Sequence, residues 1–126
     1  MANTFISSQG IEIGRSFNEP KMQEKALTII RKYRDKILLP EDAIISESEN
    51  PENHRSVDIK KIKNTDSIYD IGPKTRKSFF NEIIQCEKLL WNGPLGFFEK
   101  KPYDNGTNYI ASIIKLQKSK KFFSAA

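Results

Sequence analysis

The stretch that decides the fold is Leu89-Leu90-Trp91-Asn92-Gly93-Pro94-Leu95-Gly96-Phe97-Phe98-Glu99. Its apolar beginning, residues 89–91, predicts the end of a buried parallel strand. The glycines and the proline that follow are turn residues, because glycine adopts positive φ without steric cost and proline fixes φ and removes a donor. In open α/β sheets, ligands bind beyond the carboxyl ends of the strands, so this turn is a candidate binding loop.

The residues of this turn suit a nucleotide. Asn92 and the bare backbone of the glycines offer hydrogen bonds to phosphates, and Phe97 and Phe98 offer an aromatic wall to a flat ring. Glu99 offers a carboxylate to a pair of sugar hydroxyls. An ordinary strand-to-helix loop with two glycines explains the same spacing equally well. Spacing alone therefore leaves both interpretations open.

Length and composition set limits on the class of protein. The 126 residues allow at most one small domain, and the 37% hydrophobic and 29% charged residues are a lean composition for a globular chain. No apolar run approaches the ~18 residues of a membrane span and no signal-peptide pattern begins the chain, so we expect no membrane partner. The single cysteine, Cys86, fits the reducing cytoplasm, where we expect the protein to be located.

The net charge of +5 raises the possibility of a nucleic-acid partner. The lysines and arginines are spread over predicted helix faces with acids among them, and no aromatic-basic recognition motif appears. We therefore expect no nucleic-acid binding. A basic, non-enzymatic protein that binds RNA or an acidic partner stays as an alternative, with only the charge in its favour.

Hydrophobic periodicity predicts helices that alternate with short strands. The predicted helices cover residues 2–8, 18–35, 75–86 and 108–117, with Asn18 and Thr75 at the starts of the second and third. The predicted strands cover residues 36–39, 43–46, 67–71 and 89–91, and another begins at residue 122. Residues 47–64 predict an exposed excursion or irregular hairpin, in which His54 is a solvated loop residue. This alternation predicts an α/β fold, a three-layer, Rossmann-like, mostly parallel sheet with flanking helices.

Four segments resemble the phosphoglycerate kinase family, in the family's order and at its spacing. Residues 91–99 resemble its WNGPxGxFE signature, residues 70–75 its DIGPKT segment, residues 38–42 its LLPxD segment, and residues 1–16 its MANTF…QG…IGxS run. Together they span nearly the whole chain. The resemblance implies that residues 1–126 are part of the C-terminal, nucleotide-binding domain of a glycolytic enzyme that transfers a phosphoryl group between ATP and 3-phosphoglycerate.

The resemblance also assigns roles to residues of the turn. Glu99 would accept hydrogen bonds from the ribose hydroxyls, and Asn92 would donate to the phosphates of ADP or ATP. Pro94, Gly96 and Phe97 would form a wall along the adenosine. The family usually has a smaller aliphatic residue in place of Phe97, so this pocket would be more crowded.

Two further residues are nucleotide-binding candidates through the resemblance. Phe17 falls where the family places an apolar side chain against the adenine ring, and core packing of Phe17 is an equal alternative. Ile68 replaces a glycine that the family often has near the base. An isoleucine side chain would not reproduce that backbone contact, so Ile68 alternatively packs within its strand.

The resemblance implies Mg²⁺ bound with ADP or ATP as the cofactor. The family's phosphate-binding lysine segment would precede Met1, and the GGGD segment with the magnesium-binding aspartate would follow Ala126. The family binds 3-phosphoglycerate through a separate N-terminal domain and is usually monomeric. We therefore expect this chain to be a catalytically incomplete fragment, or a residual ADP/ATP-binding module without catalysis, and we assign it no catalytic or metal-binding residue.

Overall fold

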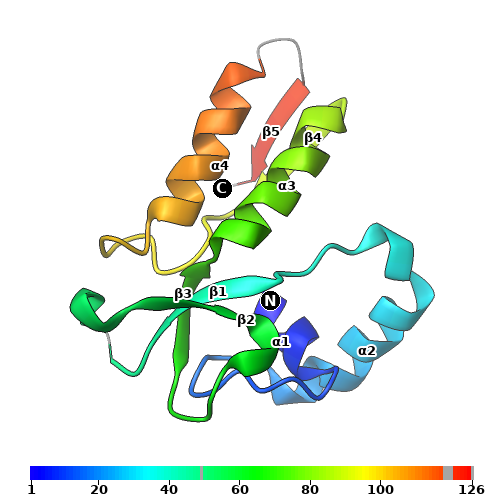
Figure 1. Ribbon diagram of the computed structural model, residues 1–126. Helices are drawn as coiled ribbons and strands as arrows, with labels where there is room; N and C mark the ends of the chain where they lie inside the picture. The colour runs from blue at the N-terminus through cyan, green and yellow to red at the C-terminus, as the bar shows by residue number, and fades with distance from the viewer. Residues whose placement is uncertain (49, 118–120, 126) are drawn as a thin grey trace.

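The structure is a computed structural model that describes residues 1–48, 50–117 and 121–125. Its helices are α1 (Ala2–Ser7), α2 (Gln23–Lys32), α3 (Pro73–Gln85) and α4 (Asn105–Leu116). Its strands are β1 (Asp42–Ser46), β2 (Arg55–Asp58), β3 (Ser67–Ile71), β4 (Lys88–Asn92) and β5 (Lys121–Ala125). Short 3₁₀ turns cover Pro20–Met22, Arg34–Lys36, Pro51–Asn53 and Ile59–Lys61. In Figure 1, α3 and α4 lie beside β4 and β5 in one half, and β1–β3 with α1 and α2 form the other.

The described strands form two sheets, and this corrects the prediction of a mostly parallel sheet. In the first sheet, β1 lies between β2 and β3 and is antiparallel to both. Only the second sheet, β4 with β5, has the predicted parallel pairing. The physical reason is that β1 and β2 are joined by a short excursion without a crossover helix, and such a connection returns the chain antiparallel. The predicted irregular hairpin over residues 47–64 is thus present, with β2 as its second strand.

A β-bulge interrupts the pairing of β1 with β3. Ile44 pairs with Asp70 and Ile45 pairs with Ile68, so the register skips Tyr69. A bulge bends the strand and leaves the extra residue outside the regular ladder. The backbone of Tyr69 is therefore available to another part of the chain, which is the candidate binding loop described below.

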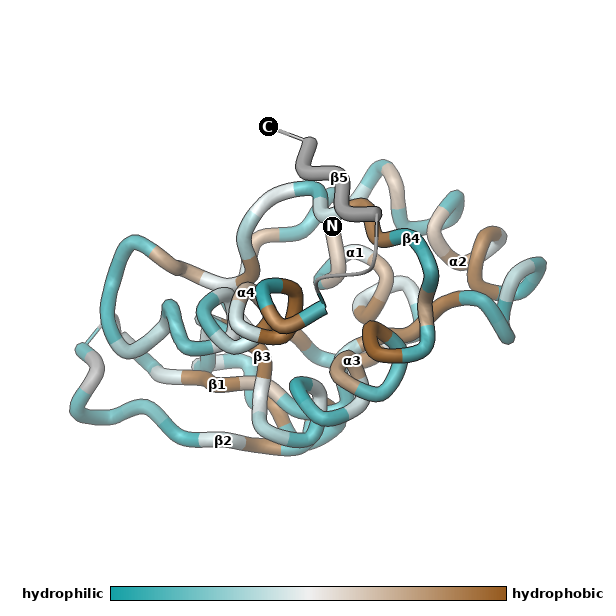
Figure 2. The backbone as a smooth tube through the Cα atoms, turned by 90° about the horizontal axis from the view of Figure 1, so that it is seen from above, coloured by the Kyte–Doolittle hydropathy of each residue, from teal (hydrophilic) through white to brown (hydrophobic). Residues whose placement is uncertain are grey.

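The main hydrophobic core lies between the first sheet and α1, and isoleucine dominates it. Its buried members are Ile6, Ile13, Ala43, Ile45, Ile59 and Ile62, with Ile11, Val57 and Ile68 packed against them. Burying a side chain of this size contributes about 1.5–3 kcal/mol relative to exposure. Figure 2 shows the pattern seen from above, with hydrophobic segments in β1, α3 and α4 between hydrophilic loops.

Residues 89–91 form part of a strand, as predicted, but the prediction that this strand is buried is wrong. β4 is present and parallel to β5, but its side chains alternate between half-buried and exposed, and Leu90 is 67% exposed. The strand pairs with β5 alone in the described part of the chain, and the half-buried side chains, Leu89 and Trp91, line an apolar groove together with Phe79 and Ile110 of α3 and α4. A strand covered on one face alternates, whereas the buried strand that we predicted is apolar on both faces.

Two other local predictions are wrong. Residues 36–39, predicted as a strand, do not form one, because Lys36 ends a 3₁₀ turn and residues 37–39 have no regular structure. Leu38 is 45% exposed. A short apolar run becomes a strand only where a partner completes its hydrogen bonds, and no described strand pairs with this one. The helix predicted over residues 18–35 is shorter, because a 3₁₀ turn at Pro20–Met22 precedes α2 and Asn18 does not cap it.

Thr75 does not cap α3, although the helix is where the sequence predicts it. The helix begins at Pro73, with Gly72 as its N-cap residue, and Thr75 lies fully buried in the first turn.

The described ranges contain no helix with the length and apolarity that a membrane crossing requires.

Candidate functional site

A cavity of about 700 Å³ lies where the first sheet meets the turn after β4. Its lining comes from six parts of the chain, namely Met1 with α1, the connector at Phe17, Pro40 with β1, the 3₁₀ turn at Ile59, β3, and residues 91–97. Cavities of a few hundred to about 1,000 Å³ are typical of small-molecule sites. The size and the mixed apolar and polar lining therefore suit a ligand as large as a nucleotide.

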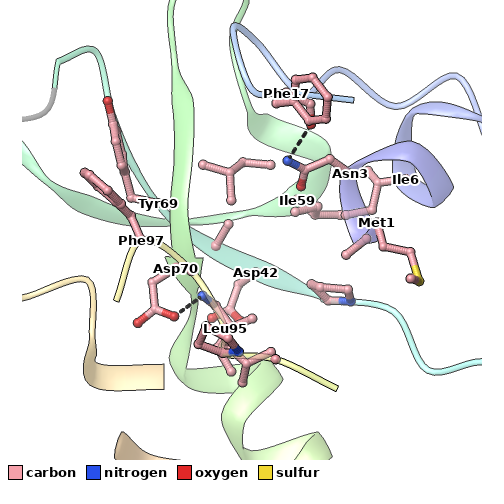
Figure 3. A pocket seen from close by; sticks show the side chains of 18 of the residues that line it. Met1, Asn3, Ile6, Phe17, Asp42, Ile59, Tyr69, Asp70, Leu95 and Phe97 are labelled. Carbon is pink, nitrogen blue, oxygen red and sulfur yellow. Dashed lines mark hydrogen bonds between the residues drawn. The ribbon is translucent and has the colours of Figure 1, made fainter. Parts of the chain in front are cut away.

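The structure brings six of the seven predicted site residues to this cavity. They are Phe17, Ile68, Asn92, Pro94, Gly96 and Phe97. Phe17 and Phe97 lie at opposite sides of the pocket in Figure 3, although 80 residues of sequence separate them. The seventh residue, Glu99, is exposed on the same loop and does not line the cavity.

The structure excludes one of the two alternatives for Phe17, and it is compatible with both alternatives for Ile68. Phe17 is 82% exposed, which excludes the core-packing alternative, and its carbonyl accepts a hydrogen bond from Asn3 Nδ2 at 3.0 Å. Ile68 is half-buried, packs against the main core and also lines the cavity. Its backbone N–H donates to Ser16 Oγ at 2.8 Å, so this backbone group is already engaged.

The loop after β4, residues 92–99, has the glycine conformations that its sequence predicts. Gly93 and Gly96 have φ of +85° and +64°. A Cβ at Gly96 would lie 2.5 Å from the carbonyl oxygen of Tyr69, whereas a Cβ at Gly93 would meet nothing within 4 Å. Next to Gly96, the N–H of Phe97 donates to that same Tyr69 carbonyl at 2.7 Å. The bulge in β3 thus leaves the carbonyl of Tyr69 free to accept the hydrogen bond that holds the 92–99 loop.

Aromatic rings extend from this contact into the cavity wall. The rings of Tyr69 and Phe97 lie 6.3 Å apart between centroids, and Tyr69 stacks on Tyr103 at 4.6 Å. Tyr103 is fully buried, whereas Phe97 remains 37% exposed. Figure 3 shows Tyr69 and Phe97 side by side at one side of the pocket. The rings of Tyr69 and Phe97 match the flat face of a purine, and the buried ring of Tyr103 restricts the movement of Tyr69.

Two buried carboxylates line the cavity and are fully engaged by the protein. Asp42 accepts hydrogen bonds from the backbone N–H groups of Lys74 and Thr75 at 3.0 and 2.8 Å. Asp70 accepts from the N–H of Gly106 at 2.7 Å and lies 3.4 Å from Arg76 Nη2. These oxygens position neighbouring elements and are not free to meet a ligand.

Burial raises the pKa of the Asp70 carboxyl above its ordinary value of 3.8. The N–H groups of Gly106 and Ile71 and the guanidinium of Arg76 act in the opposite direction, and nearby Asp104 adds to the rise. Desolvation disfavours the charged form of a carboxyl group, which explains the direction.

The described residues do not fit a magnesium site of their own. Among them, no group of three or more histidine, cysteine, aspartate or glutamate side chains could hold a metal ion. Asp42 and Asp70 are the acids of the lining, and their oxygens accept the N–H groups named above. The lining, as far as the structure describes it, also contains no lysine, arginine or histidine side chain. The side chains of the described lining are therefore suited to hold a ring and polar groups, and none of them would neutralise the charge of a phosphate.

Three residues that shape this site are not among those predicted from the sequence. Tyr69 and Asp70 support the 92–99 loop from β3, and Thr107 holds it from α4 through two hydrogen bonds to Leu95. Asp70 lies within the DIGPKT segment and Thr107 follows a glycine at a helix start, and these positions are the signals that the sequence contained. Neither signal shows which distant segment the side chain will contact.

The sequence of this chain matches a known protein family over its whole length. The family model described as phosphoglycerate kinase matches residues 1–126. A phosphoglycerate kinase from Desulforapulum autotrophicum is 36% identical over 118 residues, covering 90% of this chain and 30% of that protein. One from Sinorhizobium fredii is 39% identical over 111 residues, covering 85% of this chain and 28% of that protein. The chain thus spans about 30% of the length of these relatives.

Solved structures give the same result at the level of the fold. The structure of phosphoglycerate kinase from Coxiella burnetii superposes with a TM-score of 0.84 at 29% identity, covering 98% of this chain and 32% of that one. The enzyme from Pyrococcus horikoshii gives a TM-score of 0.73 at 20% identity, which supports the fold alone. These likenesses confirm the α/β class, and with a family model that matches every residue they show that this chain belongs to the phosphoglycerate kinase family.

Proposed function

We propose that this chain provides an ADP/ATP-binding site of the phosphoglycerate kinase type, corresponding to part of that family's C-terminal nucleotide-binding domain. The observation that carries the proposal is the convergence of Phe17, Asn92, Pro94, Gly96 and Phe97 on one cavity of nucleotide size. In the proposed pose, the adenine lies against the aromatic side of the pocket and Asn92 donates to a phosphate. Glu99, which lies outside the cavity lining, meets the ribose only if the loop closes on the ligand.

We also propose that the isolated chain binds nucleotide without transferring a phosphoryl group. Phosphoryl transfer depends on positioning and on neutralising the charge of the moving group with lysine, arginine or a metal ion. The described lining provides none of these cationic side chains, and its two carboxylates are engaged by backbone N–H groups. Magnesium would therefore arrive with the nucleotide. The reaction with 3-phosphoglycerate is a property of the family, and we assign it to the complete two-domain enzyme; a cytoplasmic location and a monomeric state stay predictions.

Calorimetric titration of the full 126-residue chain with Mg-ADP tests the proposal. We expect saturable binding in the wild type, weakened in Asn92→Ala because the phosphate donor is lost. Glu99→Ala separates the two possible states of the loop, since it weakens binding only if the loop closes on the ribose. Glu24→Ala, which removes an exposed acid on α2, is the matched control. A folded wild type that binds no Mg-ADP would contradict the proposal, and turnover above a vector control would contradict the absence of catalysis.

A further inference from the structure

A hydroxyl on α4 holds the middle of the 92–99 loop. Thr107 Oγ1 accepts a hydrogen bond from the N–H of Leu95 at 2.8 Å and donates one to the carbonyl of Leu95 at 2.7 Å. A threonine hydroxyl is both a donor and an acceptor, and here it acts in both directions on one residue. Leu95 stands between Gly93 and Gly96, the two residues of the loop with positive φ. This pair of bonds therefore satisfies both polar backbone groups at the centre of the turn.

The start of α4 is in turn fixed by β3. Gly106, the neighbour of Thr107, donates its N–H to Asp70 Oδ2 at 2.7 Å. A Cβ at Gly106 would lie 2.2 Å from Asp70 Oδ1, so the helix packs directly against this carboxylate. The side chain of Asp70 is fully buried. The position of the Thr107 hydroxyl is therefore set by the sheet, and the loop is fitted to it.

Thr107 stands behind the cavity wall and is not among the residues that line it. A second hydrogen bond holds the loop, from the N–H of Phe97 to the carbonyl of Tyr69. Without the Thr107 hydroxyl, this bond would still hold the C-terminal part of the loop. The turn between Asn92, the last residue of β4, and Leu95 would lose its support from α4.

We propose that Thr107 is a positioning residue, which acts through Leu95 to hold the turn after Asn92 in the geometry that meets a nucleotide. The part of this inference that concerns the nucleotide rests on the proposed function. The part that concerns the loop rests on the hydrogen bonds alone.

Two substitutions of the same residue separate the hydroxyl from the shape of the side chain. Thr107→Val keeps the branched shape and removes both hydrogen bonds, and Thr107→Ser keeps the hydroxyl. We would measure amide hydrogen exchange at Leu95 by NMR and the Kd for Mg-ADP by calorimetry, in the full chain. Losing about one net hydrogen bond corresponds to about a tenfold change. We expect Thr107→Val to accelerate Leu95 exchange and to raise the Kd by about that factor, and Thr107→Ser to stay within about twofold of the wild type in both.

Each other result overturns the proposal. Unchanged Leu95 exchange in Thr107→Val does so directly, and faster exchange with an unchanged Kd shows that the loop moves without consequence for the nucleotide. Equal acceleration at Leu95 and at the core residue Ile45 indicates general destabilisation and contradicts a positioning role.

Failure of the proposed function is distinguishable from failure of this inference. If the wild type does not bind Mg-ADP, the proposed function fails, and the exchange rate at Leu95 decides the role of Thr107 in the loop. If Thr107→Val does not fold, the wild type itself is decisive. A wild-type Leu95 amide that exchanges as fast as an unstructured peptide overturns the inference, and a protected one supports it.

Discussion

The carboxylate of Asp42 on β1 caps α3 from outside the helix, through Thr75. Asp42 Oδ1 accepts the N–H of Thr75 at 2.8 Å and the hydroxyl of the same residue at 2.7 Å, and Asp42 Oδ2 accepts the N–H of Lys74 at 3.0 Å. The N-cap residue, Gly72, has no side chain to perform this task. A Cβ at Gly72 would lie 2.2 Å from Asp42 Cγ, so the glycine makes room for the distant carboxylate.

Replacing this carboxylate is expected to destabilise the fold. Asp42→Asn exchanges an accepting oxygen for an amide that faces N–H donors, and a buried donor left unpaired costs about 1–3 kcal/mol. We therefore expect the free energy of unfolding to fall by about 2 kcal/mol, measured by urea denaturation followed by circular dichroism. Asp35→Asn, at an exposed position of a 3₁₀ turn, is the matched control and should change stability by less than about 0.5 kcal/mol. Equal urea midpoints for the two variants would contradict the capping role.

The two glycines of the 92–99 loop are expected to respond differently to alanine. Both have positive φ, where a Cβ costs about 1–2 kcal/mol, but only at Gly96 would the Cβ collide with backbone, 2.5 Å from the Tyr69 carbonyl. Gly96→Ala should therefore displace the loop, change the emission of the single tryptophan, Trp91, and weaken Mg-ADP binding at least about tenfold. Gly93→Ala should leave the emission maximum unchanged. The same spectral change in both variants would show that φ strain, and not the collision, controls the loop.

The stability of the chain is expected to depend on pH through Asp70. Burial raises the folded-state pKa of this carboxyl above 3.8. At a pH between the unfolded-state and folded-state pKa values, the folded chain therefore holds a proton that the unfolded chain releases. Stability attributable to Asp70 is therefore greatest below about pH 3.8 and decreases as the pH rises through the raised folded-state value. Unfolding free energies of the wild type and Asp70→Asn, measured at pH 7 and pH 4.5, isolate this contribution. The wild type should gain stability relative to the variant at the lower pH, and a gain at the higher pH would contradict the direction of the shift.

Phe17 and Ile45 should separate binding from folding. Phe17 is 82% exposed and lines the cavity, so Phe17→Ala is expected to change stability by less than about 0.5 kcal/mol while weakening Mg-ADP binding. Ile45 is 0% exposed in the core and does not line the cavity, so Ile45→Ala is expected to cost about 2–5 kcal/mol of stability. Calorimetric binding and urea denaturation on both variants provide the comparison. Phe17→Ala with unchanged Mg-ADP affinity would remove Phe17 from the proposed site.

Local chemistry explains which elements the sequence predicts correctly. The strand over residues 67–71, the turn at Gly93 and the helix predicted over residues 108–117 all depend on residues close in sequence. The structure contains all three, and the helix begins three residues earlier than predicted, at Asn105. The strand predicted over residues 36–39 and the burial predicted for β4 depend on partners that local sequence does not specify, and both predictions are wrong. The direction of β1 against β2 and β3 is a further example, since pairing direction is set by how the connections return.

The sequence alone predicted the family, the α/β class and the loop in which most of the candidate site residues lie. It did so because glycine, proline and apolar spacing act over a few residues, and because the family motifs are contiguous. The exposure of Phe17 at the cavity and the position of Glu99 outside it depend on tertiary packing, which local sequence does not specify. Only the tertiary structure placed the Thr107 hydroxyl on the backbone of Leu95. These relationships join segments far apart along the chain, and the packing of β3 and α4 around the buried Asp70 carboxylate brings them together.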